Sequence, residues 1–256
     1  MPDGMELREG HGGGEITCIH TRKVFDSCQS KDCLEDLYFY PTTSGAAALE
    51  TAAAVRSGRA ELLDVELNVS PVGLGRGFYE VNSRFYYRAV LELSTGGSRP
   101  MAVEGLLWFS KRCVLYGSEG GAKLFASSGC VAEGALPTAV CEAVDPLVLS
   151  TRMADAPHDG EEIRPGELPE QVRDAFDEEL VLQPCTGRRI YVTLGQFSIL
   201  RLERESQLLM SVFDYCMPDK ECECSEPHDE DPCQLFQNVD FPVDDFFPRT
   251  ASGGNR

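Results

Sequence analysis

The chain has no excess of positive charge and no long apolar run. It carries 23 lysines and arginines against 42 aspartates and glutamates, for a net charge of −19. Proteins that bind nucleic acid or an anionic membrane need a basic footprint, so the composition argues against both partners. No apolar stretch approaches the roughly 20 residues of a membrane-spanning helix, and we expect no membrane insertion. Residues 1–15, MPDGMELREGHGGGE, contain no apolar core, which predicts synthesis in the cytoplasm without a signal peptide.

Negative charge is concentrated in two segments. Residues 155–180 hold ten acids and two arginines, and residues 219–231 hold seven acids and one lysine. These two segments supply −14 of the net charge and leave −5 for the rest of the chain. We therefore expect the acidity to lie outside the folded body. The expected order is a flexible arm at 1–15, an acidic connector at 151–170 and an acidic, cysteine-rich tail at 216–256.

Catalytic motifs are also scarce. Only four histidines are present, and of these only His20 falls in a segment that we expect to be a strand. The glycine-rich GLGRG at 73–77 is followed by a strand-like segment, whereas a dinucleotide fingerprint opens a helix, so it predicts a hairpin turn. No nucleophile elbow, P-loop or HExxH motif occurs in its required context. We expect no enzymatic activity and no catalytic residue.

Alternation of apolar and polar residues is the clearest structural signal. It runs through residues 63–69 and again from Phe78 to Leu93, with the glycine-rich turn between them. A period of two predicts an antiparallel hairpin with one buried face. Further strands are expected at residues 16–25, 101–115, 123–126, 190–194, 197–202 and 208–213.

The predicted fold is mainly β, an antiparallel β-sandwich that is either one large sandwich or two small ones. Residues 16–150 form an antiparallel β domain with an N-terminal cysteine cluster. Residues 171–215 complete the same sandwich or form a second unit. One short helix is expected near 168–180, where four apolar residues share a side. The alanine-rich segment 43–58 is either a short helix or a mobile insert, and the phenylalanine-rich segment 241–248 resembles an extended peptide laid on an apolar groove.

Eleven cysteines are present, and four of them belong to a motif that occurs once near each end of the chain. The first copy is VFDSCQSKDC at 24–33, whose two cysteines are expected in a polar turn after the strand 16–25, and the second is VFDYCMPDKEC at 212–222. Disulfides, a metal site, or docking ends for further copies of the chain would each account for the repetition. The odd cysteine count leaves at least one unpaired in a monomer, or pairs it between molecules. The candidates for disulfides or cross-links are Cys18, Cys28, Cys33, Cys216, Cys222, Cys224 and Cys233.

A metal site is the alternative for the tail. Zinc takes four nitrogen and sulfur ligands in a tetrahedron, although the paired C-x2-C spacing typical of zinc sites is absent here. Zinc is the one cofactor that the sequence leaves open, and it would make the protein a zinc-binding β module. The candidate metal ligands are Cys216, Cys222, Cys224, His228 and Cys233.

Four segments together resemble an uncharacterised protein family of endospore-forming clostridia (Firmicutes). They are CIHTRKVFDSCQSKDCLEDL, VSPVGLGRGFYEVNSRFYYRAVLEL, YVTLGQFSILRLERESQLLMSVFDYCMPDKEC and PCQLFQNVDFPVDDFFP. The second segment is also similar, more weakly, to the β domain repeated in spore-envelope morphogenetic proteins. The resemblance implies a structural, self-associating protein of a spore coat, exosporium or surface filament. It further implies synthesis in the mother cell, a final location on the spore surface, and partners that are other copies or other spore-surface proteins. Its cysteines would cross-link ends or neighbours after the mother cell lyses.

A third hypothesis is a sandwich that binds carbohydrate or another spore protein through exposed aromatic residues such as Tyr86 and Trp108.

Overall fold

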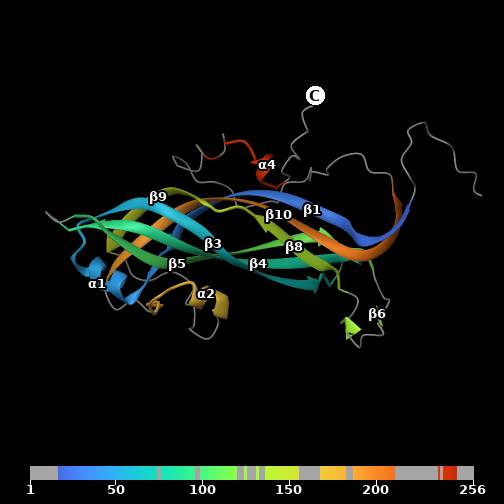
Figure 1. The fold of residues 1–256 in the computed structure, drawn as a ribbon, viewed down its shortest axis with the longest axis horizontal. Coiled ribbons are helices and arrows are strands. Elements are labelled where there is room, and N and C mark those ends of the chain that lie inside the picture. The colour runs from blue at the N-terminus through green and yellow to red at the C-terminus, as the bar shows by residue number, and fades with distance from the viewer. Residues whose placement is uncertain are drawn as a thin grey trace, which may run out of the picture.

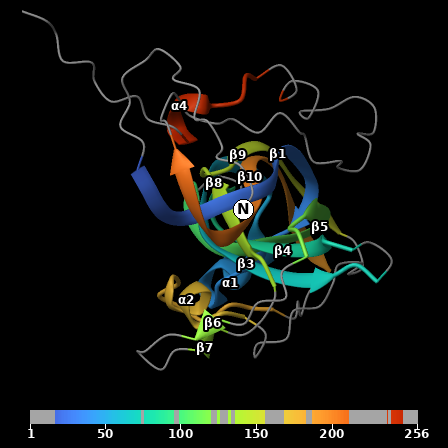
Figure 2. The same ribbon diagram turned by 90° about the vertical axis from the view of Figure 1, so that its right-hand side faces the viewer.

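Two four-stranded antiparallel sheets face each other and make up most of the structure (Figures 1 and 2). The structure is a computed structural model, and it describes residues 17–73, 76–95, 99–119, 124–125, 131–132, 136–155, 168–182, 187–210, 236 and 239–246. The predicted mainly β fold, an antiparallel sandwich, is confirmed.

The first sheet, sheet A, is built on the two longest strands. β1 (Thr17–Tyr38) pairs antiparallel with β10 (Arg188–Met210). β8 (Thr138–Ala143) and β9 (Leu147–Asp155) both pair with the other edge of β10, one after the other. They behave as one strand interrupted at 144–146, where Pro146 has no N–H to donate to a ladder.

The second sheet, sheet B, has the strand order β2-β5-β4-β3. The long hairpin of β3 (Ala54–Pro71) and β4 (Phe78–Ser94) is present as predicted, and β5 (Met101–Tyr116) pairs along the other side of β4. The short β2 (Tyr40–Pro41) carries the chain from sheet A to the edge of β5.

Three strand expectations need correction. β1 does not end in a polar turn after residue 25 but continues as a bulged strand to Tyr38. The segments 190–194, 197–202 and 208–213 were expected as separate strands, yet residues 188–210 form the single strand β10. The expected fourth strand at 123–126 does not join either large sheet. Its residues in β6 (Leu124–Phe125) pair only with β7 (Val131–Ala132).

Polar side chains in β1 do not end the strand because its bulge satisfies them locally. The register shifts between Val24 and Asp26. One Asp26 carboxylate oxygen accepts from the Ser27 backbone N–H at 2.9 Å, and the other accepts from the Tyr116 N–H at 3.0 Å. The carboxylate therefore ties β1 to the end of β5 in the opposite sheet.

The main hydrophobic core lies between the sheets. In β4 every second side chain is buried, from Val81 to Leu93, as the alternation predicted. These residues meet inward-facing residues of β10 such as Val192 and Leu194, and α1 (Thr43–Thr51) closes one end with Leu49. The alanine-rich segment is therefore helical at 43–51, and its remainder opens β3.

The outer face of sheet B is partly covered by residues 168–182. This segment contains α2 (Glu170–Asp174), so the expected helix near 168–180 is present but only five residues long. Val172 and Phe176 pack on Tyr86 and Leu106 of the sheet. The exposed polar face predicted for β4 is therefore covered at Tyr86, which is only 1% exposed.

The outer face of sheet A is covered by residues from the end of the chain. The Phe236 ring lies 4.6 Å and the Phe241 ring 5.4 Å from the ring of Phe197 on β10, measured between centroids. A Cβ atom on Gly195 would lie 2.8 Å from the Phe236 ring, so the approach needs glycine at that position. The expected apolar contact of segment 241–248 is present, but Val243–Phe246 is a short helix, α4, and not an extended peptide.

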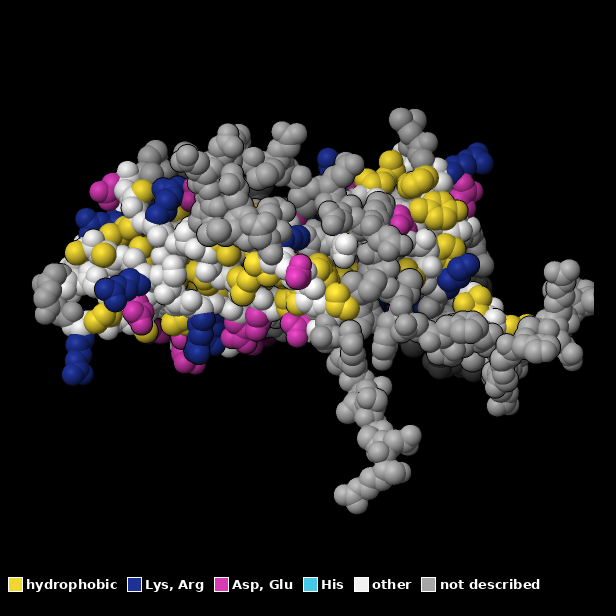
Figure 3. All heavy atoms as spheres, turned by 90° about the horizontal axis from the view of Figure 1, so that it is seen from above, with side chains coloured by type: hydrophobic (Ala, Val, Ile, Leu, Met, Phe, Trp, Pro, Cys, Tyr) yellow, Lys and Arg dark blue, Asp and Glu magenta, His cyan; other side chains and the backbone are white. Residues whose placement is uncertain are grey.

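The described surface carries charges of both signs. Viewed onto sheet A, lysine and arginine side chains are interspersed with acidic ones (Figure 3). No helix in the described part of the chain has the length and apolarity needed to cross a membrane.

Candidate functional site

The predicted N-terminal cysteine cluster is not a cluster, because its three members are spread along β1. Cys28 is buried and faces the core, Cys33 is half-buried, and Cys18 is exposed near the start of the strand. Cys28 and Cys33 are disulfide-bonded, whereas Cys18 is a free thiol. β1 therefore carries two disulfide-bonded cysteines and one exposed free thiol.

Cys28 and Cys33 cannot be bonded to each other. They pair with Leu200 and Gly195 in an unbroken register, so five residues of regular strand separate them. At about 3.3 Å per residue this places their Cα atoms about 16 Å apart, whereas a disulfide needs less than about 7 Å. Among the described residues, neither Cys113 nor Cys141 is the other end of either bond.

The two copies of the VFD motif do not occupy equivalent positions. The first begins at Val24, in the middle of β1, where it pairs with Glu203. The second begins at Val212, two residues beyond the end of β10, and lies outside the described residues. The tail candidates Cys216, Cys222, Cys224, His228 and Cys233 also lie outside them. Among the residues that are described, no three potential metal ligands are placed to hold an ion.

Polar side chains divide the core of the sandwich into two halves. On β5, Lys111 lies at an inward position between Phe109 of one half and Cys113 of the other. Its cross-strand neighbour on β4 is Ser83, and on the facing sheet Ser30 pairs with Ser198. The polar centre, as we call it, consists of Ser30, Asp32, Ser83, Lys111 and Ser198.

Lys111 reaches across the interior from sheet B to sheet A. Its ammonium Nζ lies 2.6 Å from Asp32 Oδ2, and it donates to Ser30 Oγ at 2.7 Å and to Ser198 Oγ at 3.2 Å. The Ser30 hydroxyl lies 2.9 Å from each Asp32 carboxylate oxygen. The Lys111 and Asp32 side chains are only 9% and 3% exposed. This is a buried, hydrogen-bonded ion pair that joins the two sheets.

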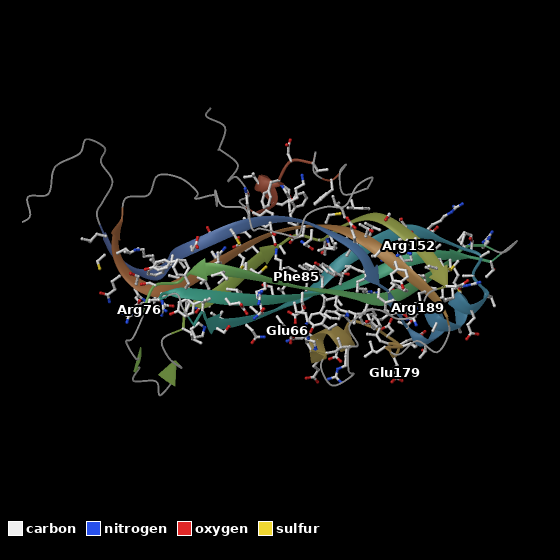
Figure 4. All side chains as sticks on the ribbon, turned by 180° about the vertical axis from the view of Figure 1, so that it is seen from behind. Glu66, Arg76, Phe85, Arg152, Glu179 and Arg189 are labelled. Carbon is white, nitrogen blue, oxygen red and sulfur yellow. The ribbon has the colours of Figure 1, made fainter. Side chains whose placement is uncertain are left out.

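The surroundings of this pair are poorly solvated. Burial raises the pKa of the Cys141 thiol to about 11, although Lys111 opposes the shift. Burial also raises the pKa of Tyr87, and the negative charge of Asp32 adds to it. The Tyr87 hydroxyl has no hydrogen-bond partner in the described part of the chain. The Phe85 ring, which Figure 4 shows between the sheets, has its centroid 5.6 Å from Lys111 Nζ.

The start of β1 and the end of β10 form a two-stranded ribbon. We use this term for Thr17–Arg22 and Glu205–Met210, which pair with each other and with no other described strand. Arg22 and Glu205 form an ion pair across it at 3.1 Å. Cys18 pairs in register with Leu209, whose side chain is 69% exposed. The ribbon thus presents strand edges, an apolar side chain and a free thiol together.

The premise of the carbohydrate hypothesis was wrong for Tyr86. Its ring is buried beneath residues 168–182, and its hydroxyl donates to Glu66 Oε2 at 2.7 Å. Trp108 is half-buried, and the Arg84 guanidinium lies over its ring at 5.2 Å. This sheet face carries a polar groove of about 390 Å³ with side chains of both charges, and Ser83 and Lys111 of the polar centre also line it. Its lining includes Glu66, Asn68, Asn82, Arg84, Ser110 and Arg112.

Tyr86 makes the stability of this face sensitive to alkaline pH. Burial first, and then the hydrogen bond to Glu66, raise its pKa from 10 to about 12. Because the folded pKa exceeds the unfolded one, the stabilisation is fully present below pH 10 and is lost as pH rises toward 12. We expect the free energy of unfolding to fall more steeply over this range in the wild type than in Tyr86→Phe. Urea unfolding at pH 8, 10 and 11 measures the difference, with the exposed Tyr116→Phe as control; equal slopes would contradict the assignment.

The sequence reasoning missed the polar centre. Its signal was present, because Ser83 and Lys111 occupy inward positions of otherwise apolar alternations. Alternation cannot show that Lys111 meets Asp32, since the two residues lie in different sheets. The chain matches no known protein family, no curated protein and no solved structure.

Proposed function

We propose that this protein is a structural, self-associating component of a bacterial spore envelope, in the coat, the exosporium or a surface filament. The observation that carries the proposal is the cysteine arrangement on β1. Two cysteines of this strand are disulfide-bonded, and a third, Cys18, is free and exposed. Oxidation then has two separate roles, because it locks the fold of each copy and links one copy to another.

The ribbon supports association with a second copy of the chain. Unpaired edges of strands accept further strands, and natural proteins protect such edges when association is harmful. Here the edges of Thr17–Arg22 and Glu205–Met210 pair with no other described strand, beside the exposed Leu209. A second copy that adds to the ribbon would bring its own exposed thiol near Cys18. The resemblance to a family of endospore-forming bacteria supports a spore envelope as the location.

Sedimentation velocity and native mass spectrometry of the full chain test this proposal. Protein purified without oxygen is compared with the same protein after exposure to air. We expect oligomers that grow with concentration, acquire covalent links in air and lose those links in reductant. Cys18→Ser should abolish most air-dependent linkage, whereas the control Cys141→Ser removes a half-buried thiol and should not.

Two results would overturn the proposal. One is a monomer at high concentration under both conditions. The other is a monomer that retains stoichiometric zinc through gel filtration, which would favour the zinc-binding module built on Cys216, Cys222, Cys224, His228 and Cys233. Oligomers that persist in Cys18→Ser without covalent links would retain strand addition and reject only the role of this thiol.

A further inference from the structure

We propose that Lys111 and Asp32 condense to an amide, an isopeptide cross-link between Lys111 Nζ and Asp32 Cγ. The bond would join β5 of sheet B to β1 of sheet A inside the core. It is independent of the cysteines and of any association between copies. A link of this kind would hold the two sheets together under reducing as well as oxidising conditions.

The geometry of the pair favours this bond. A 2.6 Å separation between Lys111 Nζ and Asp32 Oδ2 places the nitrogen near the carboxyl carbon without rearrangement of either strand. Holding reactants in contact converts a bimolecular condensation into an intramolecular one. In the best cases the effective concentration is about 10⁵ M or more, so the reaction is about 10⁵ times faster than with a reactant at 1 M. The two strands hold both backbones in place, since β1 is paired along β10 and β5 along β4.

Exclusion of water favours the same reaction. Transfer of one proton along the 2.6 Å contact converts the ammonium and the carboxylate to an amine and a carboxylic acid. The products of that transfer are the species that condense. The low exposure of both side chains, 9% and 3%, also slows hydrolysis, because few water molecules reach the bond once it has formed.

The atoms balance without a co-reactant. Nζ attacks Cγ, the new N–C bond forms, and the C–O bond to one Asp32 oxygen breaks. The ammonium and the carboxylate together yield one amide and one water molecule, with no oxidant or reductant. Ser30 is placed to pass the proton, because its hydroxyl contacts Lys111 Nζ and both Asp32 oxygens. The unpartnered Tyr87 hydroxyl supplies a further buried donor in the same part of the interior.

Intact mass spectrometry of the full chain, fully reduced and denatured, tests the proposal. We expect the wild type to be lighter than its sequence by one water molecule. Peptide mapping should find a branched peptide that joins the segment containing Lys111 to the segment containing Asp32. The Asp-Gly pairs at 3–4 and 159–160 can also lose water by forming a succinimide, so the mapping assigns the loss.

Variants separate the cross-link from an ordinary ion pair. Lys111→Arg keeps the positive charge but cannot form this amide, and it should have the full mass of its sequence. Asp32→Asn should lose ammonia in place of water. In Ser30→Ala the linked fraction of freshly purified protein should fall. The unlinked fraction should then lose water more slowly than the wild type, by a factor on the order of a hundred.

A wild-type chain with the full mass of its sequence, or with water lost only at an Asp-Gly pair, would overturn the proposal. The peptide map of the wild type gives this result even if Lys111→Arg does not fold. Rapid and complete linkage in Ser30→Ala would reject proton transfer by Ser30.

Discussion

Replacement of Asp32 by alanine is expected to lower the free energy of unfolding by about 3–5 kcal/mol, the usual effect of breaking a buried ion pair from one side. The variant would leave the Lys111 ammonium in the interior, where its remaining acceptors among the described residues are the hydroxyls of Ser30 and Ser198. If the cross-link is present, its loss acts in the same direction. Denaturation in guanidinium chloride, followed by the fluorescence of the single tryptophan, Trp108, measures the change.

The neighbouring Arg112 provides a matched control. It follows Lys111 on the same strand but faces outward, with a 69% exposed side chain paired to Glu80 at 3.4 Å. Arg112→Ala should change the stability by no more than about 1 kcal/mol, because exposed ion pairs contribute little. The double variant Asp32→Leu with Lys111→Met should recover much of the loss, since an apolar pair needs no partner charge. A loss below 1 kcal/mol for Asp32→Ala would contradict the buried pair.

Removal of the disulfide at Cys33 is expected to be the second large effect. Cys33→Ser should lower the free energy of unfolding by about 2–5 kcal/mol, because the unfolded chain regains the freedom that the bond removed. Cys28→Ala should lose a similar amount and also some packing in the second half of the core, where Cys28 contacts Leu200 and Leu202. Chemical denaturation with and without reductant measures both losses.

Cys18 supplies the control, because it is on the same strand but exposed and free. Cys18→Ser should change the stability of the monomer by less than about 0.5 kcal/mol, as expected for a surface position. Counting alkylated thiols by mass spectrometry without reductant checks the bonding directly. Equal stability of the wild type, Cys33→Ser and the reduced wild type would contradict a structural role for this bond.

The two covalent features are distinguishable by reductant. Disulfides at Cys28 and Cys33 are cleaved by thiols, whereas an amide between Lys111 and Asp32 is not. A wild type that remains resistant to denaturant after reduction, but loses that resistance in Lys111→Arg, would assign stability to the interior pair. The amide would then hold the two sheets together before the cysteines oxidise.

Local sequence patterns predicted a strand correctly where the strand's own residues show which of its faces is buried. The buried residues from Val81 to Leu93 follow the period of two seen in the sequence, and the hairpin of β3 and β4 required no long-range knowledge. Prediction was less good for strands that are buried on both faces. β10 is covered by sheet B on one side and by Phe236 and Phe241 on the other, so its pattern is not a simple alternation.

The cysteine candidates show the same limit. The sequence grouped Cys18, Cys28 and Cys33 as one N-terminal cluster and placed Cys28 and Cys33 in a turn, whereas all three lie along β1. Polar residues such as Asp26 and Asp32 suggested that turn. In the structure, Asp26 accepts backbone hydrogen bonds and Asp32 pairs with Lys111. In sheet B, the residue that contacts Asp32 and the residue that contacts Asp26 are each about 80 or more positions away along the chain. A local sequence pattern does not reach that far.

The sequence by itself determined the fold class, the hairpin of sheet B and the short helix near residue 170. These follow from short-range periodicity and composition, which depend on neighbours along the chain. Only the tertiary structure decided that β1 pairs with β10, that residues 168–182 bury Tyr86, and that Lys111 meets Asp32 between the sheets. Those contacts form when strands that are distant in the sequence pack face to face. Polar groups buried between them must then pair, because an unpaired polar group is costly in a low-dielectric interior.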